Sequence, residues 1–575
     1  MERSEDSRRE GRTEGEALGT ALTGRPGLLV GLVAVVTAVA ALHTGRALQA
    51  IGTAFGDARG RGDELVVARG DVAVRDVPKA LRMRNGRLFE DPHYAGEPHW
   101  YPFATPAVAA AVSRVFRLPI NEAYFGSAAV LSGLALVGFA VLLASFGGTL
   151  GLALFSVMLL AGVGWPSTGA YPFETAVLPF TLFFVAAAAA VRAVGGAESS
   201  PGRAPLVAMG LLGGLLGIWH GASFLVASFV SAYVFARLVV RALNHPAERR
   251  ETLLRAGLLT VTILVPFALL VGPQIIHYGH LRQSDAARLY LEPWYRGGDD
   301  WGALVRGALV PRGWGLLWLC AFAAGFARFR DARPTAMPLA IAYVVGKVLA
   351  HAGFVVNSVS HPTAAAIARR VLLVPPHTLN HVAEVAFGFM QAWLAVAIAR
   401  AVLRSKVADG LRQGWERRGL SVRHRVVQRV VGAAAFAVAT AVVVGRMPPA
   451  DKPYARPAAL DTVRFAERLS AMAGPDDVVL GANGLIHMAA LNLLWIDAPE
   501  HANPYVAEER EAAMAALERG AAAGDRRAIS EVLRRYRVRF TVGDSVVARM
   551  CGEAVVLVAP DGSPVVRLRE GCAPR

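Results

Sequence analysis

The sequence is poor in cysteine and in charged residues. Three cysteines in 575 residues exclude a small scaffold built on disulfide bonds. Charged residues make up only 18% of the chain, against about 25% in ordinary soluble domains, whereas 54% of residues are hydrophobic and the mean hydropathy is +0.40. Such hydrophobicity excludes a disordered chain. Because the apolar residues come in long blocks, we expect an α-helical polytopic membrane protein rather than a soluble multidomain enzyme.

The apolar blocks predict about eleven transmembrane helices, each near the length that crosses about 30 Å of hydrocarbon. A polar tail, residues 1–26, precedes the first block, and no small-residue cleavage site follows it, so we expect an uncleaved first helix. No internal repeat of fixed period is visible, which argues against the repeat-built transporter folds. The expected spans are residues 27–44, 122–146, 149–164, 174–192, 205–219, 222–240, 257–273, 314–327, 336–356, 380–399 and 430–446.

The net charge of +16 is interpreted from where the arginines lie along the chain. Four connections between expected spans are rich in Arg, namely residues 192–203, 237–255, 328–333 and 400–429. Because basic residues collect in cytoplasmic loops, we expect the N-terminus inside and the C-terminus outside. This orientation requires that Trp219-His220-Gly221 separate two spans instead of kinking a single one. The charge therefore reports orientation and gives no support for nucleic-acid binding.

Four segments are expected outside the membrane. Three are loops of the transmembrane domain 27–447, namely a large first loop, residues 45–121, and loops at about 274–313 and 357–379, and the fourth is a C-terminal α/β domain, residues 448–575. Cys551 and Cys572 flank neighbouring strands of that domain, where an oxidising compartment permits a bridge, although sequence alone does not supply the required Cα separation. Cys320, within a span, is expected to be a packing residue. Periodicity predicts helices at 460–473, 486–491, 507–517 and 527–536, and strands at 477–480, 539–542, 554–558 and 564–568.

The first loop carries the most informative motif of the chain. An acid and a short expected helix come first, in Val74-Arg75-Asp76-Val77-Pro78-Lys79-Ala80-Leu81, and a Gly turn follows at Gly86. Aromatic residues come next, in His99-Trp100-Tyr101-Pro102-Phe103-Ala104-Thr105-Pro106. In a large first external loop, this order resembles the GT-C superfamily of integral membrane glycosyltransferases. Glu174 is similar to the second acid of these enzymes, and residues 210–224, which include His220, resemble their Gly-rich paired helix.

This resemblance implies an enzyme of the bacterial inner membrane that moves a sugar from a polyprenyl-phosphate donor to an extracytoplasmic glycan, lipid or protein acceptor. It makes Asp76 the expected general base, a role that accelerates a transfer by about 10²–10⁴-fold, and Glu174 the expected second catalytic acid. Two structural alternatives stay open. Asp76 can cap the helix that starts near Pro78, and Glu174 can be favoured at a helix N-terminus by the helix dipole.

The leaving phosphate requires cations or hydrogen-bond donors near the outer surface. Arg369 and Arg370 offer guanidinium forks suited to phosphate, with attraction to lipid head groups as the alternative. Lys347 is an ionisable residue inside a span and could equally pair with Glu384. Packing and an interfacial aromatic belt are the alternatives for the remaining candidates. These further candidate substrate contacts are His220, His377, His381, Tyr94, His99, Trp100 and Tyr101.

No cofactor is demanded by the motif, and a divalent cation such as Mg²⁺ or Mn²⁺ is compatible with it, since carboxylates suit these ions. His377, His381 and Glu384 have a helical spacing that is also compatible with zinc, with phosphate contact or simple packing as the other interpretations, and we assign no metal site. The carboxylates that could contribute to a cation site are Asp285, Glu292, Asp299 and Asp300.

Two other classes of protein compete with the glycosyltransferase. A polytopic transporter or flippase of a lipid-linked or small substrate would show two similar halves and charged residues near the membrane midplane. A non-catalytic scaffold would use its external α/β domain to bind a cell-envelope partner. The acid-bearing first loop favours the enzyme.

Overall fold

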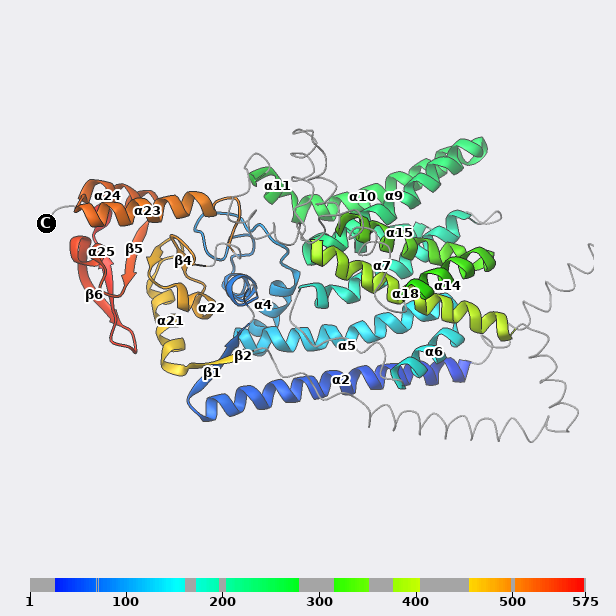
Figure 1. Ribbon diagram of the computed structural model, residues 1–575, viewed down its shortest axis with the longest axis horizontal. Coiled ribbons are helices and arrows are strands. Elements are labelled where there is room, and N and C mark those ends of the chain that lie inside the picture. The colour runs from blue at the N-terminus through cyan, green and yellow to red at the C-terminus, as the bar shows by residue number, and fades with distance from the viewer. Residues whose placement is uncertain are drawn as a thin grey trace, which may run out of the picture.

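The protein consists of a helical bundle with a mixed α/β region at one end (Figure 1). The computed structural model describes residues 26–68, 70, 72–160, 172–195, 203–278, 315–350, 376–403, 455–497 and 502–572. The long helices run side by side along the molecule. The first loop and the C-terminal region lie together beyond the same end of the bundle.

The expected spans that fall within these residues are helical. Six of the described helices, α2, α5, α7, α9, α10 and α18, are long and apolar enough to cross a membrane. The first helix continues beyond its expected end at Thr44, and the expected span 430–446 lies outside the described residues. The bundle helices are α2 (Pro26–Gly60), α5 (Ile120–Gly147), α6 (Thr149–Leu160), α7 (Pro172–Gly195), α8 (Arg203–Trp219), α9 (Gly221–Asn244), α10 (Arg249–Leu270), α14 (Gly315–Arg328), α15 (Arg333–Ala350) and α18 (Pro376–Leu403).

Glycines let pairs of bundle helices approach closely. A Cβ added at Gly133 of α5 would meet the hydroxyl of Thr44 on α2, and one at Gly214 of α8 would meet the carbonyl oxygen of Ile263 on α10. Small residues at such contacts allow backbones to pack without a large side chain between them, which is the usual way apolar helices associate in lipid. Between these contacts, Phe180, Phe183 and Phe184 fill the interior of the bundle.

The chain breaks between α8 and α9 as expected, so Trp219-His220-Gly221 separates two helices. His220 has an extended backbone (φ −159°, ψ 112°) and is the N-cap of α9, where its ring accepts a hydrogen bond from the Ser223 N–H. An N-cap side chain satisfies one of the four N–H groups that the first turn leaves open. His220, a candidate substrate contact, therefore has a structural role.

The first loop shares a sheet with the C-terminal region. Strand β1 (Asp63–Val67) pairs antiparallel with β2 (Ala455–Ala459), so residues almost 400 positions apart lie in register, from Asp63 opposite Ala459 to Val67 opposite Ala455. In Figure 1 the blue β1 and the yellow β2 meet beside the end of α2. After β1 the loop forms a π-helical turn, η1 (Val72–Asp76), and the helices α3 (Val77–Arg84) and α4 (Ala104–Phe116).

A five-stranded sheet in the order β4-β3-β5-β7-β6 forms the C-terminal region. β3 is parallel to β4 and β5, whereas β7 is antiparallel to β5 and β6. The helices and strands expected from periodicity are all present, and β2, β4 and α25 were not expected. The elements are α21 (Leu460–Met472), β3 (Val478–Leu480), α22 (Ile486–Ala489), β4 (Asn492–Leu493), α23 (Ala507–Ala523), α24 (Arg526–Arg535), β5 (Val538–Val542), α25 (Val546–Cys551), β6 (Gly552–Val558) and β7 (Pro564–Leu568).

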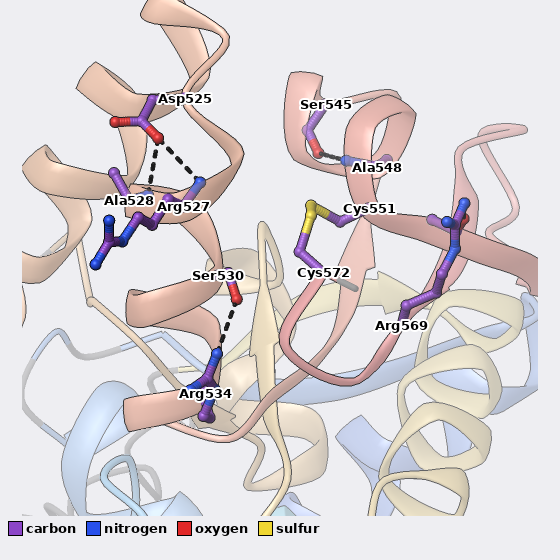
Figure 2. The surroundings of a disulfide bond; sticks show 11 residues. Asp525, Arg527, Ala528, Ser530, Arg534, Ser545, Ala548, Cys551, Arg569 and Cys572 are labelled. Carbon is purple, nitrogen blue, oxygen red and sulfur yellow. Dashed lines mark hydrogen bonds between the residues drawn. A yellow bond between two sulfur atoms is a disulfide. The ribbon is translucent and has the colours of Figure 1, made fainter. Parts of the chain in front are cut away.

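Cys551 and Cys572 form a disulfide bond, as the oxidising location would permit (Figure 2). Their Cα atoms are 4.8 Å apart, and the bond ties the end of α25 to the segment after β7. Cys551 is buried in the cluster that includes Ile529 and Leu533 of α24. Cys320 differs from expectation: it is exposed on α14 and is not a packing residue of the interior.

Candidate active site in the first loop

Asp76, the expected general base, is completely buried at the end of η1. Its two carboxylate oxygens accept hydrogen bonds from the neighbouring Arg75, from Nε at 2.9 Å to Oδ1 and from Nη2 at 3.2 Å to Oδ2. The pair is thus bidentate, the strong geometry for a guanidinium and a carboxylate. Asp76 precedes α3 but its side chain makes no capping hydrogen bond. The helix-capping alternative is therefore wrong.

Lys79 lies one turn further on, in α3, and sequence reasoning did not single it out. It is 1% exposed, and its Nζ donates to the carbonyl oxygen of Tyr101 at 2.7 Å. Burial lowers the pKa of Lys79 to about 7, a change opposed by the charges of Asp76 and Asp91 and assisted by that of Arg75. Near pH 7 this amine therefore exists in both charge states.

Tyr101, a candidate sugar contact, belongs to the same cluster. The Arg75 guanidinium carbon lies 3.6 Å from the centre of its ring, a cation–π contact, while its backbone oxygen holds Lys79. Trp100 packs edge-on against Tyr101, with ring centres 5.3 Å apart. Arg75, Asp76 and Lys79, which are buried, and Tyr101, which is half-buried, thus form one group, which we call the first-loop cluster.

The segment after Tyr101 attaches the first-loop cluster to the bundle. The Phe103 N–H donates to the Ile218 carbonyl at the end of α8 with a length of 2.8 Å. The Thr105 and Thr175 hydroxyls are 2.6 Å apart, and the Trp219 indole N–H donates to Thr175 at 3.2 Å. Glu174, the expected second acid, precedes Thr175 in the first turn of α7. The backbone of Glu174 is therefore placed where the loop meets the bundle.

Tyr94 and His99 are enclosed by protein. Tyr94 is 1% exposed, and the Arg510 guanidinium of α23 lies 5.2 Å from the centre of its ring. His99 packs against the rings of Phe89 and Phe103, and its Nε2 accepts a hydrogen bond from the Gln274 amide. Burial holds the pKa of His99 far below its ordinary value. Both side chains are packed inside the protein, and their role as sugar contacts stays a prediction.

Asp91 is a second buried carboxylate that the sequence did not reveal. It accepts hydrogen bonds from the N–H groups of His93 at 2.8 Å and Tyr94 at 3.0 Å, and from the Asn503 amide at 3.0 Å. Burial raises the pKa of Asp91 to about 6, although these three hydrogen bonds and the charge of Lys79 all lower it. From the sequence, only the local turn at Asp91 could be predicted, because Asp side chains commonly accept hydrogen bonds from backbone N–H groups two residues further along the chain.

Contacts from the C-terminal region hold the rest of the loop. Arg82 of α3, whose side chain is buried, donates to the Asn492 carbonyl oxygen. The Leu493 N–H donates to the His93 carbonyl at 2.8 Å. The first loop and the C-terminal region are therefore joined through buried polar groups as well as through the β1–β2 pair.

Lys347, a candidate phosphate contact, forms a separate cluster between α15 and α18. It is buried, and its Nζ donates to the Asn380 carbonyl oxygen, while the Asn380 amide donates to Glu384 at 2.8 Å. The pairing with Glu384 anticipated from sequence thus runs through Asn380. His381 is exposed and His377 lies in the first turn of α18. Arg369 and Arg370 lie outside the described residues.

No metal site can be built from the part of the chain that the structure describes, because no three His, Cys, Asp or Glu side chains there gather to share an ion. The four acids named for a divalent cation, Asp285, Glu292, Asp299 and Asp300, lie outside the described residues. A divalent cation stays compatible with the motif, and the chemistry below is derived from the first-loop cluster.

Comparison with known proteins finds similarity only among solved structures. No family model matches the chain, and no curated protein matches it. The apo oligosaccharyltransferase of Archaeoglobus fulgidus is similar with a TM-score of 0.42 and 12% identity, covering 91% of this chain and 70% of that one. The same enzyme in complex with Zn and sulfate gives 0.39 and 12%, covering 93% and 72%.

ArnT from Cupriavidus metallidurans, bound to undecaprenyl phosphate, is also similar, with a TM-score of 0.34, 12% identity and coverage of 96% of this chain and 100% of that one. Similarity at this level assigns no residue a role and carries no argument about function. The function is accordingly argued from the first-loop cluster itself.

Proposed function

We propose that this protein is a membrane glycosyltransferase that moves a sugar from a polyprenyl-phosphate donor to an extracytoplasmic acceptor. The observation that carries the proposal is the first-loop cluster, a buried carboxylate with a guanidinium and an amine beside it, held against the helical bundle. Buried charges are costly unless they are paired, so a fold that gathers three of them at one point is a candidate for catalysis.

The proposed placement is the bacterial inner membrane, with about eleven spans, the N-terminus inside, and both the first loop and the C-terminal region outside. The arginine-rich connections support this orientation through the positive-inside rule. The disulfide between Cys551 and Cys572 supports an oxidising location for the C-terminal region. An acceptor outside the cell or in the periplasm would then meet the cluster from the same side as the C-terminal region.

The proposed reaction is a direct displacement at the anomeric carbon of the donor sugar. The acceptor oxygen forms a bond to that carbon while the bond from the carbon to the phosphate oxygen breaks, and the electron pair leaves with polyprenyl phosphate. The acceptor proton passes to a carboxylate oxygen of Asp76, which Arg75 orients through its two hydrogen bonds. General-base help of this kind contributes about 10²–10⁴-fold to the rate.

Lys79 is the proposed contact for the leaving phosphate. In its protonated form the amine offers three N–H donors, of which one binds Tyr101, and a cation beside the departing oxygen stabilises the charge that develops there. Glu174, Arg369, Arg370 and His377 remain proposed partners of the donor or acceptor. Lys347, with Asn380 and Glu384, is a second proposed position for a phosphate, on α15 and α18.

A transfer assay tests the proposal. The purified protein is placed in liposomes and supplied with a labelled polyprenyl-phosphate sugar and an acceptor extract from the cell envelope. We expect label to move to the acceptor, with one polyprenyl phosphate released for each sugar transferred. A transporter or flippase would instead move the intact donor across the bilayer without breaking its sugar–phosphate bond. Movement of intact donor without release of polyprenyl phosphate would overturn the proposal in favour of that alternative.

A further inference from the structure

Asn503 connects the C-terminal region to the first loop and to the end of the bundle at once. It is completely buried. Its amide nitrogen donates to Asp91 at 3.0 Å and to the Tyr278 hydroxyl at 2.8 Å, while its carbonyl oxygen accepts from the Tyr505 N–H at 3.1 Å. Tyr278 ends α11 (Gly272–Tyr278), the short helix after α10. Both hydrogens and the oxygen of this one amide are therefore used.

Asp91 is the carboxylate through which Asn503 reaches the first-loop cluster. Its Oδ1 is held by two backbone N–H groups of its own turn, and its Oδ2 receives the Asn503 amide. Within the described residues, the bond from Asn503 is the one long-range hydrogen bond that the Asp91 side chain accepts. Donors to a carboxylate favour its ionised form. Removal of Asn503 would therefore favour the neutral form of Asp91.

The charge of Asp91 acts in turn on Lys79. Asp76 and Asp91 favour the protonated amine of Lys79, and Arg75 and burial oppose it. Burial, as the larger cause, and the charge of Lys79 both lower the pKa of His99. The charge of Asp91 also affects the pKa values of Arg82, Tyr94 and Tyr278.

We propose that Asn503 is a positioning residue of the transfer site: by holding Asp91 in place and ionised, the C-terminal region keeps Lys79 protonated for the leaving phosphate. This inference rests on the proposed function, because it is the proposed transfer that uses the charge of Lys79. It makes the C-terminal region a determinant of the charge at the first-loop cluster, beyond any part it has in recognising the acceptor.

Asn492 provides a matched control. Like Asn503 it is a buried asparagine of the C-terminal region that binds a first-loop side chain, but it binds the guanidinium of Arg82 and no carboxylate. Its amide nitrogen donates to the carbonyl oxygens of Pro475 and Asp477. Loss of Asn492 should loosen the same interface without removing a donor from Asp91.

The first test measures the charge of Lys79 through stability and needs no turnover. The pKa of Lys79 is lower in the folded protein than its ordinary 10.5, so between the two values the unfolded chain binds more protons and stability rises with pH. The melting temperature of the parent minus that of Lys79→Met, measured from pH 5 to 10, should begin to rise near pH 7, and we call this pH the onset. When both proteins also carry Asn503→Ala, the onset should lie lower by on the order of one pH unit.

The same onset should stay near pH 7 in an Asn492→Ala background. If the Asn503→Ala variant does not fold, Asn503→Leu replaces it, because leucine has nearly the same shape as asparagine but no hydrogen-bond donor. Asn503→Leu should move the onset in the same direction. An unchanged onset with Asn503→Ala or Asn503→Leu, or an equal movement with Asn492→Ala, would overturn the inference.

The second test is the pH profile of sugar transfer. Because the proposed role of Lys79 requires its protonated form, the rate should fall as the pH rises, and in Asn503→Ala this fall should occur at lower pH. Asn492→Ala should lower the rate without moving the profile. If neither the parent nor the variants transfer sugar, but Asn503→Ala still moves the pH at which the melting-temperature difference begins to rise, the proposed function fails and the effect of Asn503 on Lys79 stands. If sugar is transferred and Asn503→Ala leaves the pH profile unchanged, the effect of Asn503 on Lys79 is refuted and the proposed function stands.

Discussion

Replacement of Asp76 with asparagine is expected to lower the rate of sugar transfer by about 10²–10⁴-fold, the usual contribution of a general base. The amide keeps the shape of the side chain but does not accept the acceptor proton at neutral pH. It also removes the charge that pairs with Arg75, so part of the loss will come from a less well oriented cluster. The measurement is the initial rate of label transfer in liposomes at saturating donor.

Asp63→Asn is the matched control for this experiment, since Asp63 is an acid of the same loop, at the start of β1, and is not a member of the first-loop cluster. Its rate should stay close to that of the parent. The melting temperatures of both variants would show that the chains are folded. Full turnover by a folded Asp76→Asn protein would remove Asp76 from the reaction and leave Glu174 as the candidate base.

Removal of residues 448–575 is expected to abolish donor hydrolysis as well as transfer. The truncation takes β2 from β1, Asn492 from Arg82 and Asn503 from Asp91. Each buried polar group left without its partner costs about 1–3 kcal/mol, a large part of the 5–15 kcal/mol by which a typical domain is stable. The first loop should therefore become sensitive to limited proteolysis.

A double variant, Cys551→Ser with Cys572→Ser, separates this effect from a general loss of C-terminal stability. It removes the disulfide but leaves every contact with the first loop, so it should retain most of the transfer rate. Hydrolysis of the donor by the truncated protein, with a protease-resistant first loop, would show instead that the C-terminal region is an independent module.

The bundle helices and most C-terminal elements could be predicted because their signals are local. Long apolar blocks specify the bundle helices, and alternating or helical periodicity specifies the elements from Leu460 to Leu568. β2 was missed because its sequence, Ala-Arg-Pro-Ala-Ala, contains a proline and no alternation of apolar and polar residues. Only its partner β1 makes it a strand. The extension of α2 to Gly60 was missed because apolar length marks a membrane span and does not mark where a helix ends.

In the candidate site too, residues with a local signal could be predicted and residues brought together by long-range contacts could not. Asp76 and Tyr101 were found because they belong to one linear motif. Asn503 and Asp91 are separated by 412 positions, and Arg82 and Asn492 by 410, so no pattern in a single sequence joins them. Lys79 stood in the motif, but its significance comes from burial, which depends on the packing of the loop against its neighbours.

The central claim is that the first-loop cluster binds the phosphate of a lipid-linked donor. The most direct test is photo-crosslinking of the full-length protein in liposomes with a polyprenyl-phosphate sugar that carries a diazirine on its first isoprene unit, followed by peptide mapping. We predict labelled peptides from residues 72–101, competed by unlabelled donor and reduced in Lys79→Met. Labelling confined to α15 and α18, around Lys347, would contradict the claim and move the phosphate to that second cluster.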